Sequence, residues 1–219
     1  MRLKMTSGGC RAFLAGAGLL IAPTSLALEA NPPGGVRCER EADCLRGLKG
    51  LAVREGNALR LKLANGQWKV MRSNRKACDQ DDAAKCVVRE LRAYLPAQQV
   101  YVVEWTTSGD GGSEVISGAT GQTETLDTMP EFSPSGRWFV SIDPDELNDR
   151  LYDVALWSVT DGELRQELVY VRDPGTYEAW EFRGWEGDQT IKLRVTRPNA
   201  EPVDTEAIYT EAGWRLKKP

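Results

Sequence analysis

The sequence predicts an all-β fold built from antiparallel meanders. Three observations support this prediction. From residue 51 onward, apolar and polar residues alternate with a period of two, and turn dipeptides containing glycine separate the alternating runs. Helix-like patterns are almost absent, and the best two candidates are residues 39–51 and 83–95, both near cysteines. We therefore expect residues 28–219 to form a single all-β domain with a disulfide-bearing N-terminal segment over residues 28–90.

The N-terminus has the pattern of a secretory signal peptide. Residues 1–11 carry three basic residues and no acid, and residues 13–22 form an uncharged run followed by small residues. We predict cleavage after Ala27, with Ala30 as the alternative, and hence an exported protein that is periplasmic or secreted. Ten apolar residues are too few to span a bilayer, which needs about 20. The mature chain is therefore expected to have no membrane span. The alternative interpretation is a buried N-terminal helix.

Four cysteines follow the predicted cleavage site: Cys38, Cys44, Cys78 and Cys86. An even number of cysteines in an oxidising compartment predicts disulfides. The favoured pairs are Cys38–Cys44 and Cys78–Cys86, and the long-range pairings stay open as alternatives. Zinc sites use closer spacings of the C-x2-C type, which these cysteines lack.

The composition excludes several classes of function. The chain contains no histidine, which removes the commonest general base, Ser-His-Asp and Cys-His catalysis, and histidine-liganded zinc. The net charge is −4 for the full chain, and it falls to −7 when residues 1–27 are removed with their three basic residues. Such an acidic balance argues against a nucleic-acid partner, which would require a basic patch. No cofactor motif is present.

The predicted strands follow one another with tight turns between them. Asn65-Gly66 separates two alternating runs and is the strongest hairpin signal in the chain. Thr120-Gly121, Asp161-Gly162 and Ala212-Gly213 separate later pairs of runs in the same way. The expected strands cover residues 59–63, 67–71, 100–105, 114–117, 122–126, 137–142, 154–159, 163–169, 191–195, 207–210 and 214–216.

The turn glycines are the nearest approach to an internal repeat. Gly66, Gly121, Gly162 and Gly213 are separated by 55, 41 and 51 residues. A four-stranded propeller blade needs about 40–50 residues, so this spacing predicts a propeller-like fold with about four blades. A β-sandwich is the alternative, because regularly spaced hairpins suit it equally well.

One segment resembles a blade of the propellers built from WD-type and TolB-like repeats. It contains Phe132-Ser133-Pro134-Ser135-Gly136 before one strand, and the strand 154–159 with Trp157 before Asp161-Gly162. Residues 178–195 form a degenerate second copy. Together with Tyr94-Leu95-Pro96, the order of these segments is also similar to that of uncharacterised exported bacterial proteins with propeller-like repeats. The resemblance implies a propeller that binds ligands through loops on one face, and it implies no activity.

Two loops are the candidate binding surface. Residues 143–149 contain the acids Asp143, Asp145, Glu146 and Asp149, and the loop 106–113 contains Asp110. Clustered carboxylates can hold calcium, but the loop departs from the EF-hand pattern. A solvated acidic loop is the alternative interpretation, and no metal site is expected.

These observations predict an exported, non-enzymatic binding or protein-interaction module. Its partner would be an unknown protein or envelope component. One alternative is a carbohydrate-active enzyme that uses a pair of carboxylates, with Glu104, Glu178 and Glu181 as candidates because tryptophans stand near them. A second alternative is an inhibitor of an envelope enzyme.

Overall fold

A computed structural model describes residues 35–143 and 152–218, and within them the chain forms four antiparallel sheets. The all-β prediction is therefore confirmed. The predicted signal peptide, residues 1–27, lies outside the described residues. Neither described helix has the length and hydropathy that a membrane-spanning helix needs.

The sheets follow one another along the chain, and each is a meander of neighbouring strands. The first sheet contains β2 (Ala52–Glu55), β3 (Ala58–Lys62) and β4 (Trp68–Arg72). The second contains β5 (Val88–Leu95), β6 (Val100–Thr106), β7 (Gly111–Ser117) and β8 (Thr123–Leu126), with β1 (Val36–Arg37) added beside β5. The third contains β9 (Glu131–Phe132), β10 (Trp138–Ile142), β11 (Val154–Thr160) and β12 (Glu163–Tyr170). The fourth contains β13 (Ala179–Glu186), β14 (Thr190–Thr196), β15 (Val203–Thr210) and β16 (Gly213–Leu216).

Two short helices lie near the disulfides. Helix α1 (Glu41–Gly47) falls inside the predicted segment 39–51, and α2 (Arg75–Asp79) was not predicted. The disulfides are Cys38–Cys44 and Cys78–Cys86, which confirms the favoured pairing. Cys44, in α1, is fully buried and packs against the first two sheets.

The second predicted helix, over residues 83–95, is wrong, because this segment contains strand β5. A β-bulge interrupts the pairing of β5 with β6 between Leu91 and Ala93. As a result Leu91 and Tyr94 join one core cluster, while Ala93 and Leu95 join another. The bulge places apolar residues three positions apart, as in a helix, and this spacing explains the wrong prediction. The strand is in fact buried on both faces.

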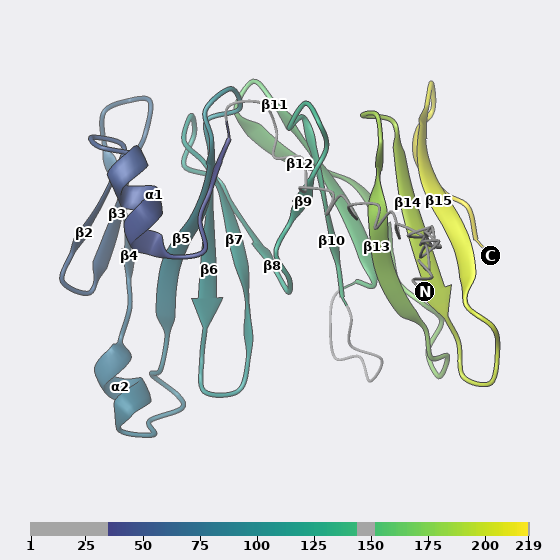
Figure 1. Cartoon of the computed structure of the whole chain (residues 1–219), viewed down its shortest axis with the longest axis horizontal. Coiled ribbons are helices and arrows are strands. Elements are labelled where there is room, and N and C mark those ends of the chain that lie inside the picture. The colour runs from purple at the N-terminus through teal and green to yellow at the C-terminus, as the bar shows by residue number, and fades with distance from the viewer. Residues whose placement is uncertain (1–34, 144–151, 219) are drawn as a thin grey trace, which may run out of the picture.

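The four sheets stack in a row, in chain order, from the first sheet at one end to the fourth at the other (Figure 1). Each pair of neighbouring sheets shares one apolar core. Leu59 and Leu61 of the first sheet pack with Tyr101 of the second. Val102 of the second sheet shares a core with Phe139 and Trp157 of the third, whose rings stack with their centroids 5.2 Å apart. Val140 of the third sheet packs with Ile191 and Leu193 of the fourth.

This row explains why the strands differ in their sequence patterns. Strands of the two inner sheets are buried on both faces and contain continuous apolar runs, such as 100–103 and 154–157. Strands of the end sheets are buried on one face and alternate, as in β14, where Lys192 and Arg194 lie between buried Ile191, Leu193 and Val195. The two end sheets lie at opposite ends of the row, so the row is open among the described residues (Figure 1).

The hairpins that contain the four turn glycines join the last two strands of the four sheets, one in each. All four glycines have positive φ, between 78° and 93°. Three of these hairpins interlock along one edge of the row, which we call the turn edge. Ala64 N donates to Gly118 O at 2.8 Å, and the hydroxyl of Ser117 donates to the carbonyl of Gly162. The turns therefore hold neighbouring sheets in register.

We predict that Gly162→Ala destabilises the protein more than Gly66→Ala. Both residues have a left-handed conformation, which costs an alanine about 1–2 kcal/mol. A Cβ atom at residue 162 would also collide with the Ala119 side chain, whereas nothing lies within 4 Å of a Cβ at residue 66. Overpacking adds about 1–3 kcal/mol. Urea denaturation of the two variants measures the difference, and equal losses in the free energy of unfolding would contradict the interlocked turn edge.

Candidate functional site

Two of the five acids that were predicted to bind, Asp110 and Asp143, lie within the described residues. Asp145, Glu146 and Asp149 lie outside the described residues. Asp143 directly follows β10 and is only 2% exposed, so it is not a solvated loop residue. Asp110 is exposed in the β6–β7 hairpin, where its Oδ1 accepts the Gly111 N–H at 2.8 Å. Within residues 35–143 and 152–218, no group of three or more Cys, Asp or Glu side chains is arranged to hold a metal ion.

A buried charged cluster, which the sequence patterns did not reveal, lies where the third sheet passes into the fourth. We call Asp153, Arg172 and Glu178 the linker cluster, and all three are more than nine-tenths buried. Asp153 Oδ2 accepts the Arg172 backbone N–H at 2.6 Å, and Arg172 Nε lies 3.4 Å from Asp153 Oδ1. Arg172 Nη1 also donates to the Glu178 carbonyl at 2.7 Å. Arg172 thus ties the 171–178 linker to the start of β11.

Glu178 is the most heavily hydrogen-bonded carboxylate of this cluster. It accepts bonds from Tyr170 Oη at 2.8 Å, from Trp180 Nε1 at 3.1 Å, and from Arg197 Nε and Nη2 at 3.0 and 2.9 Å. Burial opposes ionisation of Glu178, but these hydrogen bonds and the Arg197 charge outweigh it and lower its pKa below the ordinary value. Glu178 is therefore held as a carboxylate and joins β12, β13 and the end of β14.

The candidate carboxylates of a sugar-cleaving site are each engaged by an arginine. Besides Glu178 with Arg197, Glu104 accepts from Arg92 Nε at 2.7 Å, and Glu181 accepts from Arg183 Nη1 at 2.7 Å. Trp180 is buried in the core between the third and fourth sheets. These residues form structural ion pairs, and the tryptophan packs the core.

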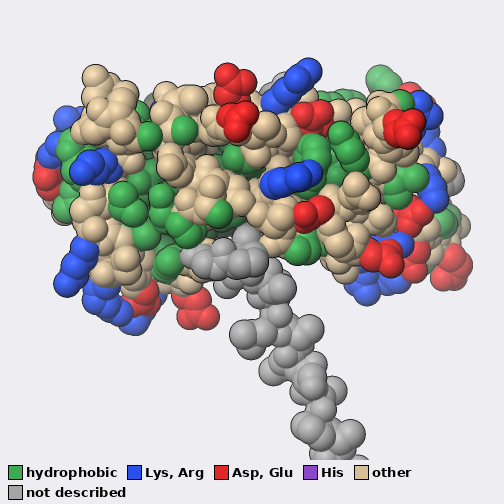
Figure 2. Space-filling view, turned by 90° about the horizontal axis from the view of Figure 1, so that it is seen from above, with side chains coloured by type: hydrophobic (Ala, Val, Ile, Leu, Met, Phe, Trp, Pro, Cys, Tyr) green, Lys and Arg blue, Asp and Glu red, His purple; other side chains and the backbone are tan. Residues whose placement is uncertain are grey.

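A cavity of about 400 Å³ opens on the turn edge between the second and third sheets. Figure 2 views the molecule from this edge. Arg137 and Asp161 are the two charged residues of the cavity wall, and both are exposed. The remaining wall residues are Ala97, Gln98, Gln99, Ala119, Val159 and Gly162.

Hydrogen bonds between turns shape this cavity. Gln98 Nε2 donates to Ser135 O at 2.6 Å, which joins the β5–β6 turn to the β9–β10 turn. Gln122 Nε2 donates to Leu164 O at 2.6 Å, and Leu164 N donates back to Gln122 Oε1 at 3.0 Å. The turns around the cavity are therefore joined to one another by hydrogen bonds.

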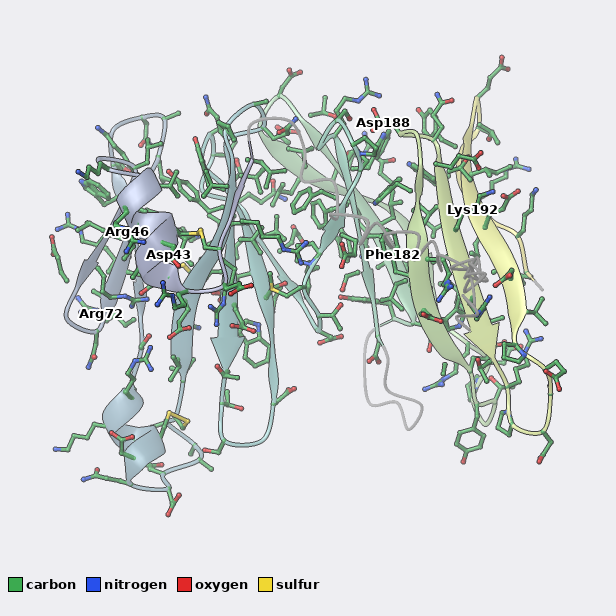
Figure 3. The ribbon with its side chains drawn as sticks, viewed as in Figure 1. Asp43, Arg46, Arg72, Phe182, Asp188 and Lys192 are labelled. Carbon is green, nitrogen blue, oxygen red and sulfur yellow. A yellow bond between two sulfur atoms is a disulfide. The ribbon has the colours of Figure 1, made fainter. Side chains whose placement is uncertain are left out.

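Asp188, from the β13–β14 turn, links the fourth sheet to the β9–β10 turn beside the cavity (Figure 3). Its Oδ1 accepts the Ser135 N–H at 3.0 Å. Burial opposes ionisation of Asp188, but hydrogen bonds from Ser135 and Ser133 and the charge of Arg137 outweigh it and lower its pKa. This carboxylate is thus already engaged by the β9–β10 turn.

The outer face of the first sheet is a second candidate surface, which we call the first-sheet face. Register places Val53, Arg60, Lys62, Trp68, Val70 and Arg72 on it, opposite the buried Leu59 and Leu61. Val53 and Val70 are 36% and 45% exposed. The Arg60 guanidinium lies 5.1 Å from the centroid of the Trp68 ring and pairs with Glu55 at 2.9 Å. This face combines exposed apolar and basic groups.

We predict that Glu178→Gln removes a pH-dependent part of the stability. A carboxyl group whose pKa is lower in the folded chain stabilises it above its unfolded pKa, and this contribution is lost as the pH falls through the folded pKa. The wild type should therefore lose stability as the pH falls below about 4.5, the ordinary pKa of Glu. The variant should start less stable at neutral pH and lose less on acidification. Urea denaturation at several pH values measures both slopes, and parallel curves would contradict the prediction.

Comparisons with protein-family models, with curated proteins and with solved structures found no match to this chain.

Proposed function

We propose that this protein is an exported, non-enzymatic interaction module that holds an acidic segment of a partner protein on the first-sheet face. The observation that carries the proposal is the contrast between the two end faces of the row. Both faces lack a neighbouring sheet among the described residues (Figure 1). The two faces nevertheless differ in how far their charged side chains are paired and in the apolar side chains that they expose.

Two pairs of opposite charges lie across neighbouring strands on the outer face of the fourth sheet, beside Arg215, which forms no ion pair among the described residues. Lys192 lies 2.7 Å from Glu206, and Arg194 lies 2.7 Å from Asp204. Hydrogen bonds from Lys192 and Lys217 lower the pKa of Glu206 to about 2. Lys192 is labelled on this sheet in Figure 3. Because these charges are paired with one another, this end of the row needs no partner and is compatible with exposure to water.

Among the described basic residues of the first-sheet face, only Arg60 is compensated, by its ion pair with Glu55. Lys62 and Arg72 form no ion pair with another residue of the part of the chain that is described, and exposed valines stand beside them. Arg72 is labelled at this end of the row in Figure 3. On a chain whose net charge is negative, this basic and apolar face favours a partner that brings carboxylates and apolar side chains.

Three features support the remaining parts of the proposal. Two disulfides and the N-terminal pattern of residues 1–27 support export, with a partner in the cell envelope or outside the cell. The meander order and the one glycine hairpin per sheet support a propeller-like stack in which each sheet corresponds to a blade. The arginine partners of Glu104, Glu178 and Glu181 support a role without catalysis.

The test uses a synthetic peptide of alternating glutamate and valine, titrated into the folded protein by calorimetry. We expect the paired variant Lys62→Glu with Arg72→Glu to weaken binding by about tenfold or more, because two attractive charges become repulsive. Arg215→Glu, on the exposed outer face of the fourth sheet, is the matched control and should bind as the wild type does. Equal effects of the two changes, or no binding to the wild type, would refute the proposal.

A further inference from the structure

We infer that the turn-edge cavity binds a small zwitterion of the size of a dipeptide, with the ligand carboxylate on Arg137 and the ligand ammonium group on Asp161. This inference goes beyond the protein contact proposed above. The cavity lies between the second and third sheets, whereas the first-sheet face is the outer surface of the first sheet. The two sites can therefore be tested separately.

The cavity holds one cation and one anion that do not neutralise each other. Among the described residues, Arg137 and Asp161 do not form an ion pair with each other, and the charge of Arg137 acts on Asp188 of the neighbouring turn. The Arg137 guanidinium lies over the Trp138 ring, 6.0 Å from its centroid. The nearby Asp188 is already bonded to the Ser135 N–H at 3.0 Å. A ligand that carries both a carboxylate and an ammonium group would form ion pairs with both residues.

The backbone sets the spacing of the two residues that carry these charges. Arg137 O accepts the Val159 N–H at 2.8 Å, so Arg137 lies opposite Val159 on β11. Asp161 follows two residues later, which places its Cα roughly 7 Å farther along the strand direction. Asp161 and Gly162 both have positive φ, at 52° and 78°, as a two-residue hairpin turn of this kind requires. The backbone positions that carry the guanidinium and the carboxylate are therefore fixed by the β10–β11 pairing and the β11–β12 turn.

The size and the remaining polar groups favour a peptide over a free amino acid. A volume of about 400 Å³ lies in the usual range for ligand pockets, about 300–1,000 Å³. Gln98 and Gln99 add carboxamides, which supply both donors and acceptors and so complement a peptide bond. Ala97, Ala119 and Gly162 are small and leave room above the wall.

The test measures, by calorimetry, the affinity of the full folded chain for three probes: dialanine, N-acetyl-dialanine and dialanine amide. N-acetylation removes the ammonium group, and amidation removes the carboxylate. We expect each capped probe to bind the wild type about tenfold more weakly than dialanine, because each loses a hydrogen bond to a charged group.

Two variants assign the charges. Arg137→Gln should bind dialanine and its amide equally, because the group that recognises the carboxylate is gone. Asp161→Asn should bind dialanine and its N-acetyl form equally, and asparagine also tolerates the left-handed conformation of residue 161. Arg215→Gln, far along the chain on β16, is the matched control and should keep the wild-type order of affinities.

The inference is overturned if dialanine does not bind the folded wild type, or if the three probes bind it equally. It is also overturned if the Arg137 and Asp161 variants, shown to be folded by circular dichroism, keep the wild-type preferences. The result of the peptide titration of the first-sheet face is independent of these outcomes, because that assay uses a different surface and different variants. Failure of either proposal is thus distinguishable from failure of the other.

Discussion

The burial of sheet faces against one another is the interaction on which the rest of this structure depends. Each sheet is too small to bury its own apolar side chains, so consecutive sheets share cores, as Val102 does with Phe139 and Val140 with Leu193. The two inner sheets are covered on both faces, and the two end sheets on one. The open ends of the row therefore become the surfaces whose side-chain chemistry decides what the protein can contact.

The two long edges of the row hold the sheets in place by different means. On the turn edge, short hairpins interlock through backbone bonds and through Gly162, which packs against Ala119. At the passage from the third to the fourth sheet, the buried pair of Asp153 and Arg172 ties the linker to β11. Buried ion pairs contribute little net stability, but removing one partner is costly because it leaves an uncompensated buried charge. The cavity between Arg137 and Asp161 owes its fixed walls to the interlocked edge.

Most strands could be predicted because alternation and turn residues are local properties. Asn65-Gly66 and Asp161-Gly162 mark hairpins that the structure contains. Strand β5 could not be predicted, because its bulge beside Leu91 places neighbouring residues in two different cores. The linker cluster could not be predicted for a related reason: Asp153 precedes Arg172 by 19 residues, and only the fold makes them neighbours.

By itself the sequence determined the all-β class and the positions of the main turns, because each depends on residues within one hairpin or one short loop. It favoured the two disulfide pairs that the structure contains, but it left the long-range pairings open. The contrast between alternating β14 and continuously apolar β11 was explained only by the fold, in which β14 is covered on one face and β11 on both. Tertiary structure alone decided that the sheets form an open row, that Asp143 is buried, and that Arg137 and Asp161 share a cavity. These outcomes depend on how separate sheets pack together, which no local pattern encodes.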